Sequence, residues 1–137
     1  MATDAGVATV LVVDDEELLR SYMTRVLESD GYSVIEAENG VEALSLLSRK
    51  DTGVVVDLVI TDVRMPRMGG RALAASLAQH HSSPPVLFVS GSHTPSDVSG
   101  PLLRKPFTPD ALSALARELL QVPPGSSSYE PRLARPQ

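Results

Sequence analysis

The feature of this chain that most restricts its fold is a set of apolar stretches that each end in a polar residue. VLVVDD runs into Asp14 and Asp15, VVVDLVITD into Asp62, PVLFVS into Ser90 and PLLRK into Lys105. Continuous Val- and Leu-rich runs are typical of strands that are buried on both faces of a parallel sheet. Because parallel strands all end at one edge of their sheet, we expect these polar side chains to meet in a single crevice.

Segments with helical periodicity lie between most of these strands, and YSVIEA predicts one more strand. Asn39-Gly40 marks the start of a second helix, RALAASLAQHH predicts a third, and Thr108 is a suitable N-cap for the last. The alternation favours a flavodoxin-like (βα)5 three-layer sandwich with a parallel sheet in the order 2-1-3-4-5. The apolar residues expected to face the core are Leu18, Leu19, Tyr22, Met23, Val26 and Leu27 in the first helix and Val41, Leu44 and Leu47 in the second.

One connection breaks the alternation. Only the 11 residues GSHTPSDVSGP lie between Ser90 and Leu102, and Val98 is their single large apolar side chain. A parallel crossover needs about a dozen residues and is usually an α-helix. We therefore expect the fourth helix to be reduced to about one turn or a loop.

Length and composition favour a single domain, since the chain has 137 residues and 42% of them are hydrophobic. No stretch approaches the roughly 18 unbroken apolar residues of a membrane span, and MATDAGVAT lacks the parts of a signal peptide. The absence of cysteine excludes disulfides and thiol catalysis, and a net charge of -5 without a basic stripe argues against direct nucleic acid binding. We expect a cytoplasmic protein with a flexible N-terminus at 1–6, a folded domain at 7–121 and a disordered tail or linker stump at 122–137.

The three strand-end carboxylates suit a divalent cation. Asp14 alone has an ordinary explanation as an N-cap, with Glu17 three residues later in a capping-box pattern. Two like charges about 4 Å apart, however, repel by around 4 kcal/mol at an effective dielectric of 20, so three converging acids need compensation. Oxygen ligands that leave room for water and a phosphoryl oxygen favour Mg²⁺ or Mn²⁺.

A carboxylate beside such an ion can act as a nucleophile and become an acyl phosphate. Asp62 is the preferred acceptor because it ends the central strand, whereas Asp14 and Asp15 form a neighbouring pair suited to holding the ion. Lys105 would neutralise phosphoryl charge, and the Ser90 hydroxyl would donate a hydrogen bond to a phosphoryl oxygen.

Four motifs in order resemble the receiver domain of two-component response regulators. They are VLVVDDEE, TDVRMPRMGG, VSG and KPFTPDAL, and the resemblance spans about Val10 to Leu120. It implies that a histidine kinase or a phosphotransfer His phosphorylates Asp62 with Mg²⁺. It also implies metal contacts from Asp15, Asp62 and the Arg64 carbonyl, a structural Gly70 and a cis bond between Lys105 and Pro106.

Two positions and the short crossover depart from that family. Leu102 stands where the family carries its switch aromatic, which couples to Ser90, and Gly69 stands where an acid is common. A short crossover would leave the fifth strand as a thinly covered edge and would favour association with a partner or a second copy. We expect the phosphorylation chemistry to be retained. The output, which is an interaction with an unknown downstream protein or the formation of a homodimer, is expected to differ from that of the family.

Three other readings compete. A pseudo-receiver would act as a binding module without phosphorylation. A phosphatase or phosphomutase would use Asp14 as its nucleophile with Glu16 as the acid two residues on. A flavodoxin would need a Ser/Thr/Gly-rich phosphate loop after the first strand, which is missing. A receiver would not be a turnover enzyme, and the chain would be either standalone or the receiver of a hybrid histidine kinase.

Overall fold

The computed structural model describes residues 7–48, 55–79, 83–91 and 100–121. Within them, five parallel strands form one sheet in the order β2-β1-β3-β4-β5, which confirms the predicted flavodoxin-like topology. The strands are β1 (Thr9–Val13), β2 (Ser33–Ala37), β3 (Leu58–Asp62), β4 (Val86–Ser90) and β5 (Leu102–Arg104).

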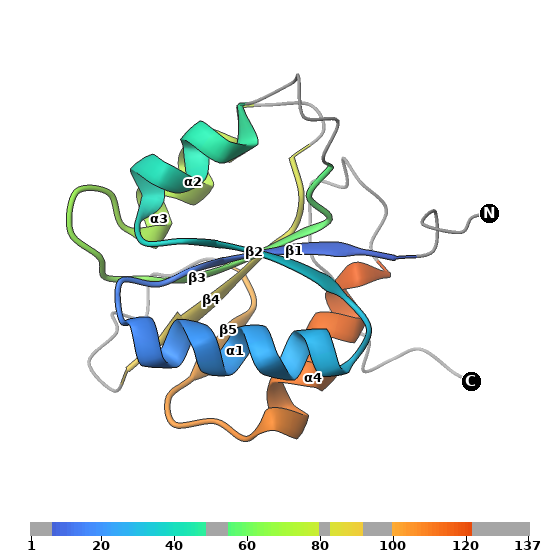
Figure 1. The fold of residues 1–137 in the computed structure, drawn as a ribbon. Coiled ribbons are helices and arrows are strands. Elements are labelled where there is room, and N and C mark those ends of the chain that lie inside the picture. Colours follow the sequence, from blue (N-terminus) through green and yellow to red (C-terminus); the bar gives the residue numbers. More distant parts are fainter. Residues whose placement is uncertain (1–6, 49–54, 80–82, 92–99, 122–137) are drawn as a thin grey trace.

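Helices cover both faces of this sheet. α1 (Glu17–Ser29) and α4 (Pro109–Leu120) lie on one face, and α2 (Gly40–Leu47) and α3 (Gly70–Leu77) lie on the other (Figure 1). Local sequence sets two of the helix starts, because the Asn39 side chain accepts from the Glu42 N–H at 2.9 Å and Thr108 accepts from the Ala111 N–H at 3.1 Å. Because all five strands are parallel, the β1–α1, β3–α3 and β5–α4 connections leave the sheet at the same edge.

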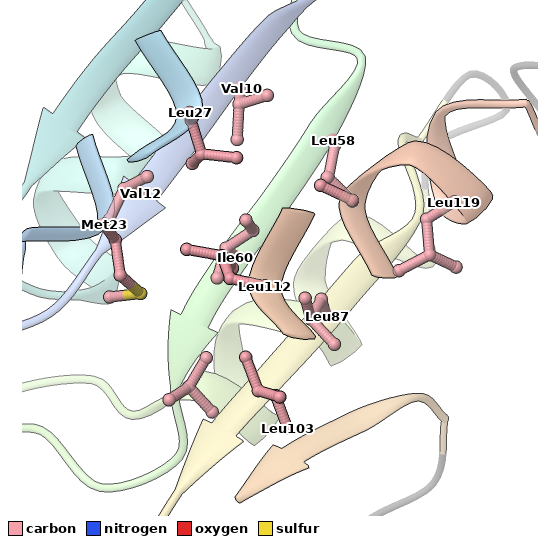
Figure 2. Packing of buried hydrophobic residues seen from close by; sticks show 12 residues of the cluster. Val10, Val12, Met23, Leu27, Leu58, Ile60, Leu87, Leu103, Leu112 and Leu119 are labelled. Carbon is pink, nitrogen blue, oxygen red and sulfur yellow. The ribbon is translucent and has the colours of Figure 1, made fainter. Parts of the chain in front are cut away.

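The apolar core is split by the sheet into two clusters. Between the sheet and α1 and α4, strand side chains interdigitate with helix side chains (Figure 2). The residues of this cluster are Val10, Val12, Met23, Leu27, Leu58, Ile60, Leu87, Val89, Leu103, Leu112, Ala116 and Leu119. A second cluster under α2 and α3 includes Leu11, Val13, Ala43, Val59 and Leu73. Strands β1 and β3 are thus buried on both faces, as their unbroken Val-rich sequences predict.

Two residues predicted to face the core do not. Leu18 is 82% exposed and Val41 is 39% exposed. Leu18 precedes the fully buried Leu27 by nine residues, or two and a half helical turns, and so points to the opposite side of α1. Val41 precedes the buried Ala43 by two residues and is similarly turned away. Two strands begin later than the apolar residues of the sequence would suggest, since Val7 and Val55 are exposed and precede β1 and β3.

The predicted shape of the fourth crossover lies largely outside the described residues, which include Gly91, Gly100 and Pro101 but not 92–99. The same holds for the termini at 1–6 and 122–137. Among the segments that the structure describes, the helices are too short or too polar to cross a bilayer.

Candidate functional site

Asp14 is fixed at the carboxyl end of β1 by its own backbone and side chain. Its N–H donates to the Ala37 carbonyl at 3.1 Å, and its Oδ1 accepts from the Glu16 N–H at 2.8 Å. Glu16, not Asp14, is the N-cap residue of α1, so the capping-box interpretation of Asp14 is wrong. The other oxygen, Oδ2, is buried and has no hydrogen-bond partner among the described residues. A buried carboxylate oxygen without a partner is costly unless a ligand reaches it.

Asp62 ends β3 and lies beside the β1 acids. Asp14, Asp15 and Asp62 can each offer one carboxylate oxygen such that these atoms all lie within 4.8 Å of one another. Asp14 and Asp62 are buried, whereas Asp15 is exposed. Three oxygen donors with one open side fit a hard divalent cation that keeps some of its water.

Burial makes the charged forms of these acids unfavourable in the absence of a cation. The pKa of Asp14 is raised from 3.8 to about 6, mainly by desolvation and also by the negative charge of Asp62, while the hydrogen bond from the Glu16 backbone opposes the rise. Desolvation also raises the pKa of Asp62, while Lys105 and the backbone of Arg64 and Val63 lower it. The site therefore carries a negative charge that its protein surroundings compensate only in part.

Lys105 supplies the positive charge at this edge. Its Nζ lies 3.4 Å from Oδ2 of Asp62, and its backbone N–H donates to the Ser90 carbonyl at 2.8 Å. The bond to Pro106 is cis, which confirms the prediction. Beyond it, the Phe107 ring packs against Tyr22 of α1 with centroids 6.0 Å apart. The β5–α4 loop that carries Lys105 is thus in contact with both β4 and α1.

Ser90 ends β4 and is 2% exposed. Its hydroxyl donates to the Gly91 carbonyl at 3.3 Å, and its pairing partner across the sheet is Arg104. Leu102, at the predicted switch position, is half-buried and pairs with Phe88. The structure therefore places Ser90 at the same sheet edge as Asp62 and Lys105, while its hydrogen bond to a phosphoryl group and the switch role of Leu102 stay predictions.

The β3–α3 loop follows Asp62 and returns close to it at Gly70. Gly70 begins α3 so close to β3 that a Cβ there would collide with the Asp62 carbonyl oxygen, which accounts for a glycine at this position. Gly69 is the N-cap residue of α3 and makes no side-chain capping bond. Arg64 lies two residues beyond Asp62, and its backbone helps to stabilise the Asp62 carboxylate. The metal contact expected from the Arg64 carbonyl stays a prediction.

Two arginines of this region carry no clear sequence signal. Arg20 of α1 donates from Nη1 to the Asp14 carbonyl at 2.7 Å. Arg67 has a φ of 71°, and the Met68 N–H donates to the Pro66 carbonyl at 2.8 Å across it. Sequence patterns treat both as ordinary polar residues, since neither the guanidinium contact nor the positive φ can be read from spacing.

Taken together, the arrangement can hold one cation and present the Asp62 carboxylate to an electrophile beside it. Asp14, Asp15, Asp62 and Lys105 are brought together as the strand ends predict. His80, His81, Ser92 and His93 lie outside the described residues.

Comparison with known proteins identifies the same domain type from sequence. The model of the response regulator receiver domain matches residues 10–117. The sensor kinase CckA of Brucella abortus (strain 2308) is 40% identical over 128 residues, which are 88% of this chain and 13% of that protein. The response regulator MprA of Mycobacterium sp. (strain KMS) is 35% identical over 119 residues, which are 82% of this chain and 50% of that protein. The chain thus spans half or less of these curated relatives.

Solved structures agree with the fold. The crystal structure of the receiver domain from the hybrid histidine kinase CckA has a TM-score of 0.70 and 31% identity and covers 83% of this chain and 100% of that one. A response regulator receiver domain protein from Clostridium thermocellum has a TM-score of 0.74 and 26% identity, covering 83% of this chain and 94% of that one.

Proposed function

Because this chain belongs to the response regulator receiver family, we propose that it accepts a phosphoryl group on Asp62 in the presence of Mg²⁺. The donor is a histidine kinase or a phosphotransfer protein, and the phosphorylated domain signals through altered protein–protein interaction. The single observation that supports this most is the convergence of three carboxylates within 4.8 Å beside a lysine ammonium.

The Asp62 carboxylate acts as the nucleophile. One of its oxygens attacks the phosphorus of a phosphohistidine, the P–N bond breaks, and the imidazole leaves with the electron pair, so that an acyl phosphate forms on Asp62. Lys105 then shifts its hydrogen bond from the carboxylate to a phosphoryl oxygen, and Ser90 donates to another. Water later attacks the phosphorus, the P–O bond to Asp62 breaks, and inorganic phosphate leaves, which restores the Asp62 carboxylate. The protein thus hydrolyses only its own phosphoryl group and does not act as an enzyme on a separate substrate.

Asp14, Asp15 and Asp62, with the Arg64 carbonyl, hold the cation. The buried Oδ2 of Asp14, which has no hydrogen-bond partner among the described residues, and the raised pKa of Asp14 both support a cation at this position. When bound, Mg²⁺ or Mn²⁺ neutralises carboxylate and phosphoryl charge and orients the phosphoryl group for in-line transfer. We place this chemistry in the cytoplasm, with the chain acting either alone or as part of a larger kinase.

A small phosphodonor tests the proposal without the cognate kinase. Incubation with acetyl phosphate and Mg²⁺ should add the mass of one phosphoryl group, stable to acid and labile to base, and Asp62→Asn should not gain it. Chelation of the metal should abolish the increment. An unmodified wild-type protein under these conditions would point instead to a pseudo-receiver, and an increment located on Asp14 would point to phosphatase-like chemistry.

A further inference from the structure

Arg20 connects the metal-binding acids to two other elements of the fold. Its Nη1 donates to the Asp14 carbonyl at 2.7 Å, and its Nε donates to Oε1 of Glu36 on β2 at 2.8 Å. Thr24, one turn along α1, donates to the second Glu36 oxygen at 2.9 Å. The Arg20 side chain is only 12% exposed and its bond to the Asp14 carbonyl is partly buried, whereas the Glu36 side chain is 37% exposed and its bond to Arg20 faces water.

The Asp14 peptide is therefore held from three directions. Its N–H is bonded to Ala37 of β2, its carboxylate to the Glu16 backbone, and its carbonyl to Arg20. Only the first two of these bonds come from the local chain or from the sheet. The Arg20 hydrogen bond restrains the peptide between Asp14 and Asp15 from outside the local chain, and the orientation of that peptide affects where the exposed Asp15 carboxylate leaves the backbone.

Glu36 and Thr24 serve this contact by orienting the guanidinium. A planar guanidinium can bond a carboxylate through Nε and a carbonyl through Nη1 at the same time, whereas a lysine ammonium acts as a single flexible point charge. The carboxylate of Glu36 also offsets the arginine charge, which would otherwise oppose a cation held by the neighbouring acids.

We propose that Arg20 is a positioning residue for the divalent-cation site, acting through the Asp14 carbonyl with Glu36 and Thr24 as its support. This inference rests on the proposed Mg²⁺-dependent function. It goes beyond that function by assigning part of the cation affinity to a residue that does not contact the cation.

Charge and positioning make opposite predictions for Arg20→Gln. Removing a positive charge near the site would by itself tighten Mg²⁺ binding. Loss of a supporting hydrogen bond instead weakens metal binding, and we expect the Mg²⁺ dissociation constant to be roughly tenfold larger. Arg20→Lys keeps the charge but cannot make both bonds, so it should weaken binding in the same direction. Arg25→Gln, which removes an exposed arginine of the same helix, is the matched control and should leave the affinity within about twofold.

Mg²⁺ affinity is measured by calorimetric or NMR titration of the metal alone into each variant of the full chain. Phosphorylation by acetyl phosphate should slow in Arg20→Gln at limiting Mg²⁺ and recover at saturating Mg²⁺. Urea denaturation reports whether each variant is folded. If Arg20→Gln does not fold, the Mg²⁺ affinity of Arg20→Lys tests the inference instead. A folded Arg20 variant that binds Mg²⁺ as tightly as the wild type overturns the inference, whereas a wild type that binds no Mg²⁺ overturns the proposed function itself.

Discussion

The ammonium of Lys105 lies 3.4 Å from Oδ2 of Asp62, although the two residues are 43 positions apart in the chain. This distance is longer than the 2.7–2.9 Å of a close charge-assisted hydrogen bond. Both side chains are partly accessible, at 26% for Lys105 and 12% for Asp62. The lysine therefore lowers the pKa of Asp62 without being locked to it, and its hydrogen bonds can pass to a phosphoryl group.

Replacing Lys105 with methionine tests this relationship. Phosphorylation of Asp62 by acetyl phosphate should slow by roughly 10²-fold, because a preorganised donor to the transferring group is lost. Mg²⁺ binding should be unchanged or tighter, since a cation near the acids has been removed. Arg104→Gln removes the exposed positive charge of the preceding residue and serves as control. A Lys105→Met protein that is phosphorylated at the wild-type rate would contradict the role given to the lysine.

The raised pKa of Asp14 predicts how metal-free stability depends on pH. The folded state binds a proton on Asp14 more tightly than the unfolded chain does, because its pKa is about 6 instead of 3.8. The stability from this group is therefore fully present below pH 3.8 and is lost as pH rises through about 6. At pH 7 without metal, Asp14→Asn should be more stable than the wild type by on the order of 2 kcal/mol.

Urea denaturation of both proteins across this pH range, with a chelator present, measures the effect. The stability difference should shrink toward pH 4, and Mg²⁺ at pH 7 should stabilise the wild type but not Asp14→Asn. A difference that does not change with pH would show that burial of the Asp14 charge is not its cause.

The strand pattern of the sequence was sufficient to predict the sheet order and the meeting of Asp14, Asp15, Asp62 and Lys105. The meeting of these side chains follows from chain direction, since parallel strands end at one edge, whereas the sheet order follows from the flavodoxin-like fold that the alternation of strands and helices favours. The sequence predicts less well which residues of each helix face the core. Leu18 lies four residues before Tyr22, as expected for one apolar helix face, and yet it is 82% exposed. The apolar spacing indicates a helix but does not fix which of its apolar residues pack against the sheet.

The remaining site features depend on tertiary contacts that have no local pattern. Arg20 bonds a backbone carbonyl and a carboxylate from another strand, and any exposed helical arginine would look the same in sequence. Arg67 adopts a positive φ that is uncommon for a side chain of its kind. Both conformations arise only once the loop and the helix are packed beside β1 and β3.

Gly70 should tolerate no larger side chain. A Cβ at this position would collide with the backbone of Asp62, which cannot move without displacing the phosphoacceptor. We expect Gly70→Ala to lower the free energy of unfolding by about 1–3 kcal/mol and to slow phosphorylation as well. Gly91→Ala is the matched control, because a Cβ there meets nothing within 4 Å, and it should change stability by no more than about 0.5 kcal/mol. Urea denaturation compares the two, and an equal effect would refute the close-contact explanation.

Replacing Arg67 with glycine should stabilise the protein. With a φ of 71° and a hydrogen bond from the Met68 N–H to the Pro66 carbonyl, Arg67 occupies the centre of a tight turn that L side chains disfavour. Relief of strain of about 1–3 kcal/mol is partly offset by the greater flexibility of glycine in the unfolded chain, about 0.4–1 kcal/mol. Arg67→Gly should therefore raise the free energy of unfolding by about 1 kcal/mol. Arg71→Gly, placed within α3, should instead lower it by about 1 kcal/mol, and changes of the same sign in both variants would rule out backbone strain at Arg67.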